Sequence, residues 1–100
     1  MAKKGYWIAH VNITNPERYK DYIAANAEPL RKYGARFLVR NGDRTLPEGQ
    51  LLAGRRHAVI EFDSYAAAKA CYESPEYQAA VKIRAEASTA DFVINEGYEG

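Results

Sequence analysis

Apolar residues recur along this chain with two different periods, and the change of period divides it into strands and helices. Residues 6–13 contain β-branched and aromatic residues without a turn former, which predicts a buried strand. In residues 16–33 the bulky residues recur at spacings of three, four and seven, which predicts a helix with one buried face. Pro29 lies inside that pattern and predicts a kink or break near residues 25–28.

The remainder of the chain contains three more predicted strands and a long helical stretch. In residues 35–40, Phe37 and Val39 alternate with Arg36, Leu38 and Arg40, and residues 55–62 and 90–98 have strand composition. Residues 63–88 are helical in two segments. Turn formers join the second and third strands in a long hairpin connection, with an extended arm expected at residues 51–53.

Capping residues mark the expected helix ends. Asn15 precedes a proline and predicts the start of the first helix. Asp63 or Ser64 is expected to begin the second helix, and Ser74 begins the third before another proline. Gly34 is expected to end the first helix in the left-handed conformation.

The resulting βαββαβ order predicts an α+β fold, a ferredoxin-like sandwich formed by residues 1–100 as one domain. Its antiparallel sheet is expected in the spatial order 4-1-3-2, with the helices on one face. Strands one, three and four carry apolar residues on both faces, whereas a half-solvated sheet is apolar on one face only. We therefore expect a second copy of the chain to cover the other face in a homodimer.

Strict alternation along the strands predicts which side chains share that second face. Trp7 and its neighbours of the same parity are uniformly apolar and are expected to face the helices. The residues expected on the open face include these polar ones: Tyr6, His10, Asn12, Arg36, Arg40, His57 and Glu61. They predict a partly polar cavity that a second subunit closes.

Two of these groupings have a catalytic interpretation and a structural one. His10 and Glu61 are expected on neighbouring strands, where a carboxylate could hold the imidazole in one tautomer for proton transfer. Alternatively, they are a buried polar pair that satisfies its own hydrogen bonds. Arg40, with Arg36 behind it, could bind a carboxylate or enolate oxygen, or could form an ion pair with Glu61 or with an acid of the partner chain.

Metal and thiol chemistry have weaker support in the sequence. His10, His57 and Glu61 have the residue types of a two-histidine, one-carboxylate site, but their spacing matches no metal motif, so no metal or other cofactor is expected. Cys71 lies in an alanine-rich helix, far from both histidines, and core packing is its expected role.

Charge and composition narrow the range of partners. The net charge of the 100 residues is +1, which offers no electrostatic basis for binding nucleic acid or an anionic membrane. The N-terminus has a basic start like that of a secretory signal, but His10 and Asn12 interrupt its apolar run. A single cysteine agrees with a reducing compartment, and a cytoplasmic location is expected.

Several segments together resemble the uncharacterised bacterial family called domain of unknown function 1330. They are GYWIAHVNITNPERYKDY, KYGARFLVRNG, AVIEFDSYAAAKACYESPEYQ and the last predicted strand. The resemblance implies the dimeric α+β barrel superfamily, in which two ferredoxin-like subunits pack sheet to sheet around a central cavity. That superfamily includes cofactor-free quinone-forming monooxygenases, muconolactone isomerases and stress-responsive proteins, so the fold does not fix a function.

Two functional hypotheses follow. In the first, the dimer binds a small metabolite without chemistry, through residues such as Tyr6, Asn12, Arg36 and His57. In the second, it is a cofactor-independent monooxygenase or isomerase that acts on a small aromatic or conjugated acid. His10 would then be the general base, Glu61 would orient it, and Arg40 would stabilise an oxyanion.

Overall fold

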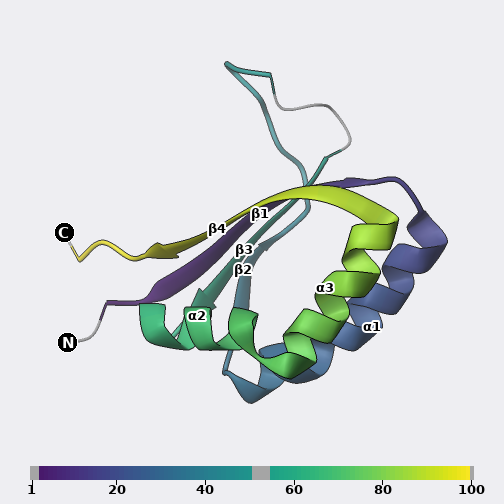
Figure 1. Ribbon diagram of the computed structural model, residues 1–100. Helices are drawn as coiled ribbons and strands as arrows, with labels where there is room; N and C mark the ends of the chain where they lie inside the picture. The colour runs from purple at the N-terminus through teal and green to yellow at the C-terminus, as the bar shows by residue number, and fades with distance from the viewer. Residues whose placement is uncertain (1–2, 51–54, 100) are drawn as a thin grey trace.

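The computed structural model describes residues 3–50 and 55–99, which form four strands and three helices. The elements are β1 (Gly5–Ile13), α1 (Pro16–Lys32), β2 (Arg36–Arg40), β3 (Arg56–Phe62), α2 (Tyr65–Glu73), α3 (Pro75–Ala87) and β4 (Ser88–Glu96). All strand pairs are antiparallel, in the order β2-β3-β1-β4. The helices gather on one face of this sheet (Figure 1). The predicted ferredoxin-like fold and strand order are thereby confirmed.

The core lies between the sheet and the helices and is built around Trp7 of β1. The Trp7 ring contacts Phe62 and Tyr77 at centroid distances of 4.9 and 4.7 Å, and its Nε1 donates a hydrogen bond to the Ala68 carbonyl at 2.9 Å. Ala68 and Cys71 of α2 are fully buried. Because these side chains are small, α2 can approach the sheet closely enough for that hydrogen bond.

The helix ends follow the predicted capping residues. The side chain of Asn15 accepts a hydrogen bond from the Arg18 N–H, and Ser64 begins α2 in the same way. Ser74 separates α2 from α3, as expected. Gly34 has a φ of +71°, the left-handed conformation expected after the first helix.

Of the kink or break expected near residues 25–28, the break does not occur, because α1 continues through Pro29 to Lys32. Pro29 has no backbone N–H to donate to the preceding turn. Its carbonyl still accepts a hydrogen bond from the Tyr33 N–H at 3.1 Å. Pro29 and Leu30 are both buried against the core. Their packing stabilises the last turn despite the lost hydrogen bond.

The residues that follow β2, 41–50, project beyond the body of the domain (Figure 1). The arm expected at residues 51–53 lies outside the described residues. Within the described part of the chain, no helix has both the length and the apolar character needed to cross a bilayer.

Candidate functional site

The sheet face opposite the helices carries its side chains in three rows that cross neighbouring strands. Residues paired directly across antiparallel strands point to the same face, so the register defines each row. The rows contain Asn95, Tyr6, Glu61 and Arg36; then Val93, Ile8, Val59 and Val39; then Asp91, His10 and His57. A wholly aliphatic row therefore separates two polar ones.

The first polar row is a closed hydrogen-bonded cluster centred on Glu61. One carboxylate oxygen accepts a hydrogen bond from the Tyr6 hydroxyl at 2.9 Å. The other accepts from Arg36 Nε at 3.1 Å and Nη2 at 2.9 Å. These hydrogen bonds, first that of Tyr6 and then those of Arg36, hold the pKa of Glu61 below its ordinary value. Glu61 is therefore an ionised structural anchor whose two oxygens are already engaged.

The aliphatic row is only partly covered within one chain. Val93 on the edge strand β4 is 49% exposed, and Val39 on the opposite edge strand β2 is 41% exposed. Ile8 and Val59 complete the row between them and are partly buried. Four aliphatic side chains thus form a band across the full width of the sheet, on the face that the helices leave open (Figure 1).

The third row contains a direct contact between two histidines. The Nδ1 atoms of His10 and His57 lie 2.7 Å apart, with the rings nearly perpendicular at 78°. One Nδ1 must donate and the other must accept, so the accepting ring carries its proton on Nε2. When both rings are neutral, the pair presents one Nε2–H donor and one free Nε2 acceptor.

The surroundings of His57 favour its neutral form. Burial lowers the pKa of His57, and the nearby guanidinium charges of Arg44 and Arg55 lower it further. His57 is therefore neutral at pH 7, where it can accept a proton or a hydrogen bond.

Two residues at the edge of the histidine row were missed in the sequence. Asp91 of β4 lies directly opposite His10 in the strand register. Its carboxylate accepts a hydrogen bond from Arg55 Nη1 at 2.9 Å. The parity of β4 relative to His10 would have identified Asp91. Asn12 lies on the same face as expected, one row further along and opposite Thr89.

The predicted contact between His10 and Glu61 is not formed. Glu61 lies opposite Tyr6, four residues along β1 from His10, which corresponds to roughly 13 Å of strand. His57 occupies the position next to His10 instead. A carboxylate that orients the His10 ring was the basis of the predicted proton-transfer pair, and Glu61 does not serve this purpose.

The predicted position of Arg40 on the open face is also wrong. A β-bulge between Phe37 and Val39 inserts one extra residue into β2, so Arg40 pairs with Ala58, which lies on the helix side. The Arg40 guanidinium lies 4.4 Å from the centre of the Phe37 ring. The same bulge places Val39 on the open face, where Arg40 had been expected, while Arg36 forms the ion pair with Glu61.

Cysteine and metal chemistry have no geometric basis in this part of the molecule. Within residues 3–50 and 55–99, no group of three or more His, Cys, Asp or Glu side chains is placed to hold a metal ion. Burial raises the pKa of the Cys71 thiol to about 12, so the reactive thiolate is scarce at pH 7. The expected packing role of Cys71 is confirmed by its complete burial.

Solved structures similar to this chain share its fold at low sequence identity. A protein of unknown function from Rhodopseudomonas palustris, RPA0582, has a TM-score of 0.79 and 15% identity, over 100% of this chain and 86% of that one. A dimeric ferredoxin-like protein of unknown function from Thermobifida fusca has a TM-score of 0.64 and 17% identity, over 96% and 92%. SnoaB, a cofactor-independent oxygenase from Streptomyces nogalater, has a TM-score of 0.67 and 10% identity, over 99% and 97%.

At the level of sequence, comparison with curated proteins gives no match. The family described as Domain of unknown function (DUF1330) matches residues 4–98, nearly the whole chain. This agrees with the resemblance of the individual sequence segments. The chain belongs to the DUF1330 family.

Proposed function

We propose that this protein is a homodimer that binds a small metabolite between the open faces of its two sheets. The observation that carries the proposal is the aliphatic row, which crosses all four strands on the face without helices. An apolar band in this position is stabilised when another apolar surface removes it from water. The similar T. fusca protein is described as dimeric, which supports a second copy as the covering surface.

The polar rows define what such a ligand would contact. Because both oxygens of Glu61 already accept hydrogen bonds from Tyr6 and Arg36, the first row forms one polar wall of the proposed site. The His10 and His57 pair offers a donor and an acceptor close together. This arrangement suits a small molecule with a hydroxyl and a carbonyl on neighbouring atoms, whose hydrocarbon part lies against the aliphatic row.

The histidine pair also supports a second candidate, proton abstraction from such a ligand. The free Nε2 of the pair takes the proton of an acidic hydroxyl or C–H group, which leaves an oxyanion or enolate and an imidazolium. The neighbouring histidine accepts a hydrogen bond from that imidazolium. A cofactor-independent oxygenase or isomerase needs this first step, and SnoaB, which shares the fold, is described as a cofactor-independent oxygenase. Neither Glu61 nor Arg40 takes part in this version of the mechanism.

Native mass spectrometry of gently purified protein tests the assembly and the ligand together. We expect twice the chain mass of 11.2 kDa, with a reproducible additional small-molecule mass. In His57→Gln the dimer should persist and the additional mass should be lost. A dimer that retains the same ligand without His57 would contradict the assigned binding site.

A surface variant tests the interface separately. Val93→Lys introduces a charge into the aliphatic row, and we expect it to produce monomers at micromolar concentration. Ala27→Lys is the matched control, because Ala27 is exposed on α1, away from the open face. Light scattering that gives dimers for both variants would place the interface elsewhere, and monomeric wild-type protein would refute the homodimer.

A further inference from the structure

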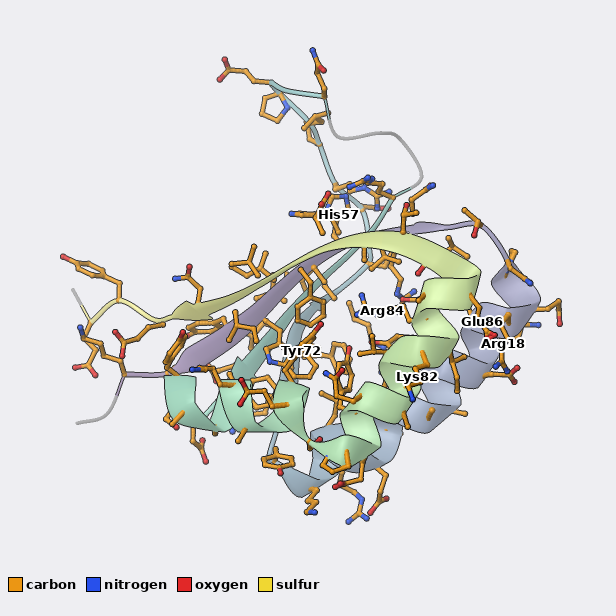
Figure 2. The ribbon with its side chains drawn as sticks, in the orientation of Figure 1. Arg18, His57, Tyr72, Lys82, Arg84 and Glu86 are labelled. Atoms are coloured by element: carbon orange, nitrogen blue, oxygen red, sulfur yellow. The ribbon has the colours of Figure 1, made fainter. Side chains whose placement is uncertain are left out.

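Arg84 is a buried charged residue on the opposite side of the sheet from the histidine pair. It lies in α3 and is only 7% exposed, on the same helix face as the fully buried Tyr77, Ala80 and Ala87. Figure 2 shows its side chain directed into the space between α3 and the sheet. An arginine at a buried position of a helix is unusual.

The Arg84 guanidinium has no anionic partner among the residues that the structure describes. Its buried Nε makes no hydrogen bond there, and none of the ion pairs within residues 3–50 and 55–99 includes Arg84. Glu86, two residues further on, pairs with Arg18 on the outer side of the helices instead (Figure 2). A buried charge without a counter-charge is destabilising, so this arrangement requires an explanation.

Aromatic rings hold the guanidinium in place without neutralising it. The Tyr22 and Phe92 ring centres lie 5.7 and 5.2 Å from its central carbon. Such cation–π contacts favour a fixed orientation of the plane but leave the net charge uncompensated. A second cation, Arg56, lies 6.0 Å from the nearby Tyr19 ring. The local potential is therefore positive.

A cavity of about 210 Å³, open to solvent beside the exposed Ala85 and Ala90, adjoins Arg84 at the junction of α3 and β4. Its lining consists of Val81, Arg84, Ala85, Ser88 and Ala90. The Ser88 hydroxyl donates a hydrogen bond to the Arg84 carbonyl at 2.8 Å. Arg84 is the charged residue of this lining, and Val81, Ala85 and Ala90 contribute apolar side chains.

We propose that this cavity binds a small monocarboxylate with an apolar body, whose carboxylate pairs with the Arg84 guanidinium. A planar guanidinium with free donors matches a carboxylate in both charge and geometry. The apolar lining accommodates a hydrocarbon or aromatic body. The site is independent of the proposed function, because it lies on the helix side of the sheet and needs neither His10 nor His57.

Titration with benzoate, followed by calorimetry, tests the proposal, with benzamide as the uncharged probe of similar shape. We expect saturable binding of benzoate to the wild-type protein and at least tenfold weaker binding of benzamide. Arg84→Gln should weaken benzoate binding at least tenfold, whereas Arg18→Gln, on the outer surface, should leave it unchanged. Equal affinity of benzoate for wild-type protein and Arg84→Gln would overturn the proposal, as would the absence of saturable benzoate binding to the wild type.

Arg84→Met separates binding from folding. Methionine keeps an unbranched chain of similar reach but removes the unpaired charge, so we expect its Tm to equal or exceed that of ligand-free wild-type protein. Benzoate should raise the Tm of the wild type and leave that of Arg84→Met unchanged. If benzoate raises both Tm values equally, Arg84 does not bind the carboxylate and the assignment is wrong.

Discussion

At the scale of single residues, the protonation of His57 is expected to affect the stability of the sheet. Its folded-state pKa is lowered by burial and by the nearby cations, so the unfolded chain binds the proton more readily. The free energy of unfolding should therefore be highest above about pH 6.5, the ordinary histidine pKa, and decrease as the pH falls through the lower folded-state pKa. Urea denaturation at pH 7.5 and 5.5 measures this decrease.

His57→Gln is the informative comparison, because it removes the titrating group and keeps a hydrogen-bonding side chain next to His10. We expect a smaller loss of stability between pH 7.5 and 5.5 in this variant than in the wild type. NMR titration of the His57 ring protons provides a direct check. A midpoint above pH 6.5 would contradict the assigned direction of the pKa shift.

The thiol of Cys71 offers a second test at this scale. It is fully buried and its pKa is raised to about 12, so native protein should react with iodoacetamide far more slowly than unfolded protein. Mass spectrometry of samples alkylated with and without urea measures the difference. Rapid alkylation of the native protein would show that α2 opens readily or packs differently.

Individual residues also show which features of the open face the sequence determines and which it does not. The polar nature of the open face was predictable, because His10 and Asn12 interrupt an apolar strand. The partner of His10 was not predictable, because alternation assigns a face but leaves the register between strands undetermined. Glu61 and His57 share one parity in β3, and only the pairing of Tyr6 with Glu61 places His57 next to His10.

At the scale of elements, Ser74 joins α2 to α3 and is expected to contribute strongly to stability. Its hydroxyl accepts a hydrogen bond from the Tyr77 N–H at 3.2 Å and donates one to the Cys71 carbonyl at 2.7 Å. Ser74→Ala removes both in a buried setting, and we expect a loss of about 1–2 kcal/mol. Chemical denaturation measures this loss.

Asn15→Ala is the matched control for Ser74→Ala. Asn15 caps α1 by a single hydrogen bond at an exposed position, so its loss should be the smaller of the two. An equal or larger effect at Asn15 would show that the second hydrogen bond of Ser74 contributes little.

The order of the elements was predictable from the sequence, since hydrophobic period and capping residues agree along most of the chain. The bulge in β2 was not, because RFLVR contains no glycine or proline to mark an inserted residue. One extra residue reverses the parity of everything after it, which moves Arg40 to the helix side and Val39 to the open face. The wrong face predicted for Arg40 therefore has a single backbone cause.

At the scale of the whole molecule, the two faces of the sheet have different requirements. The helix side is closed by an aromatic core around Trp7, whereas the other side exposes the aliphatic row. The sequence indicated this second apolar surface, because strands that are apolar on both faces predict a covering layer. It did not indicate the unpaired Arg84, since the aromatic rings that surround it come from α1 and β4 and meet only in the folded chain.

If the open face is buried in a homodimer, folding and association are coupled, and the Tm must depend on protein concentration. Each tenfold increase in concentration favours the folded dimer by about 1.4 kcal/mol. Two chains of this length have an unfolding entropy of roughly 0.4 kcal/mol/K, so the Tm should rise by about 3 °C per tenfold increase. Calorimetry over two decades of concentration measures this rise. Val93→Lys should lower the Tm and abolish its concentration dependence, because the monomer then unfolds alone, whereas Ala27→Lys should keep the wild-type slope.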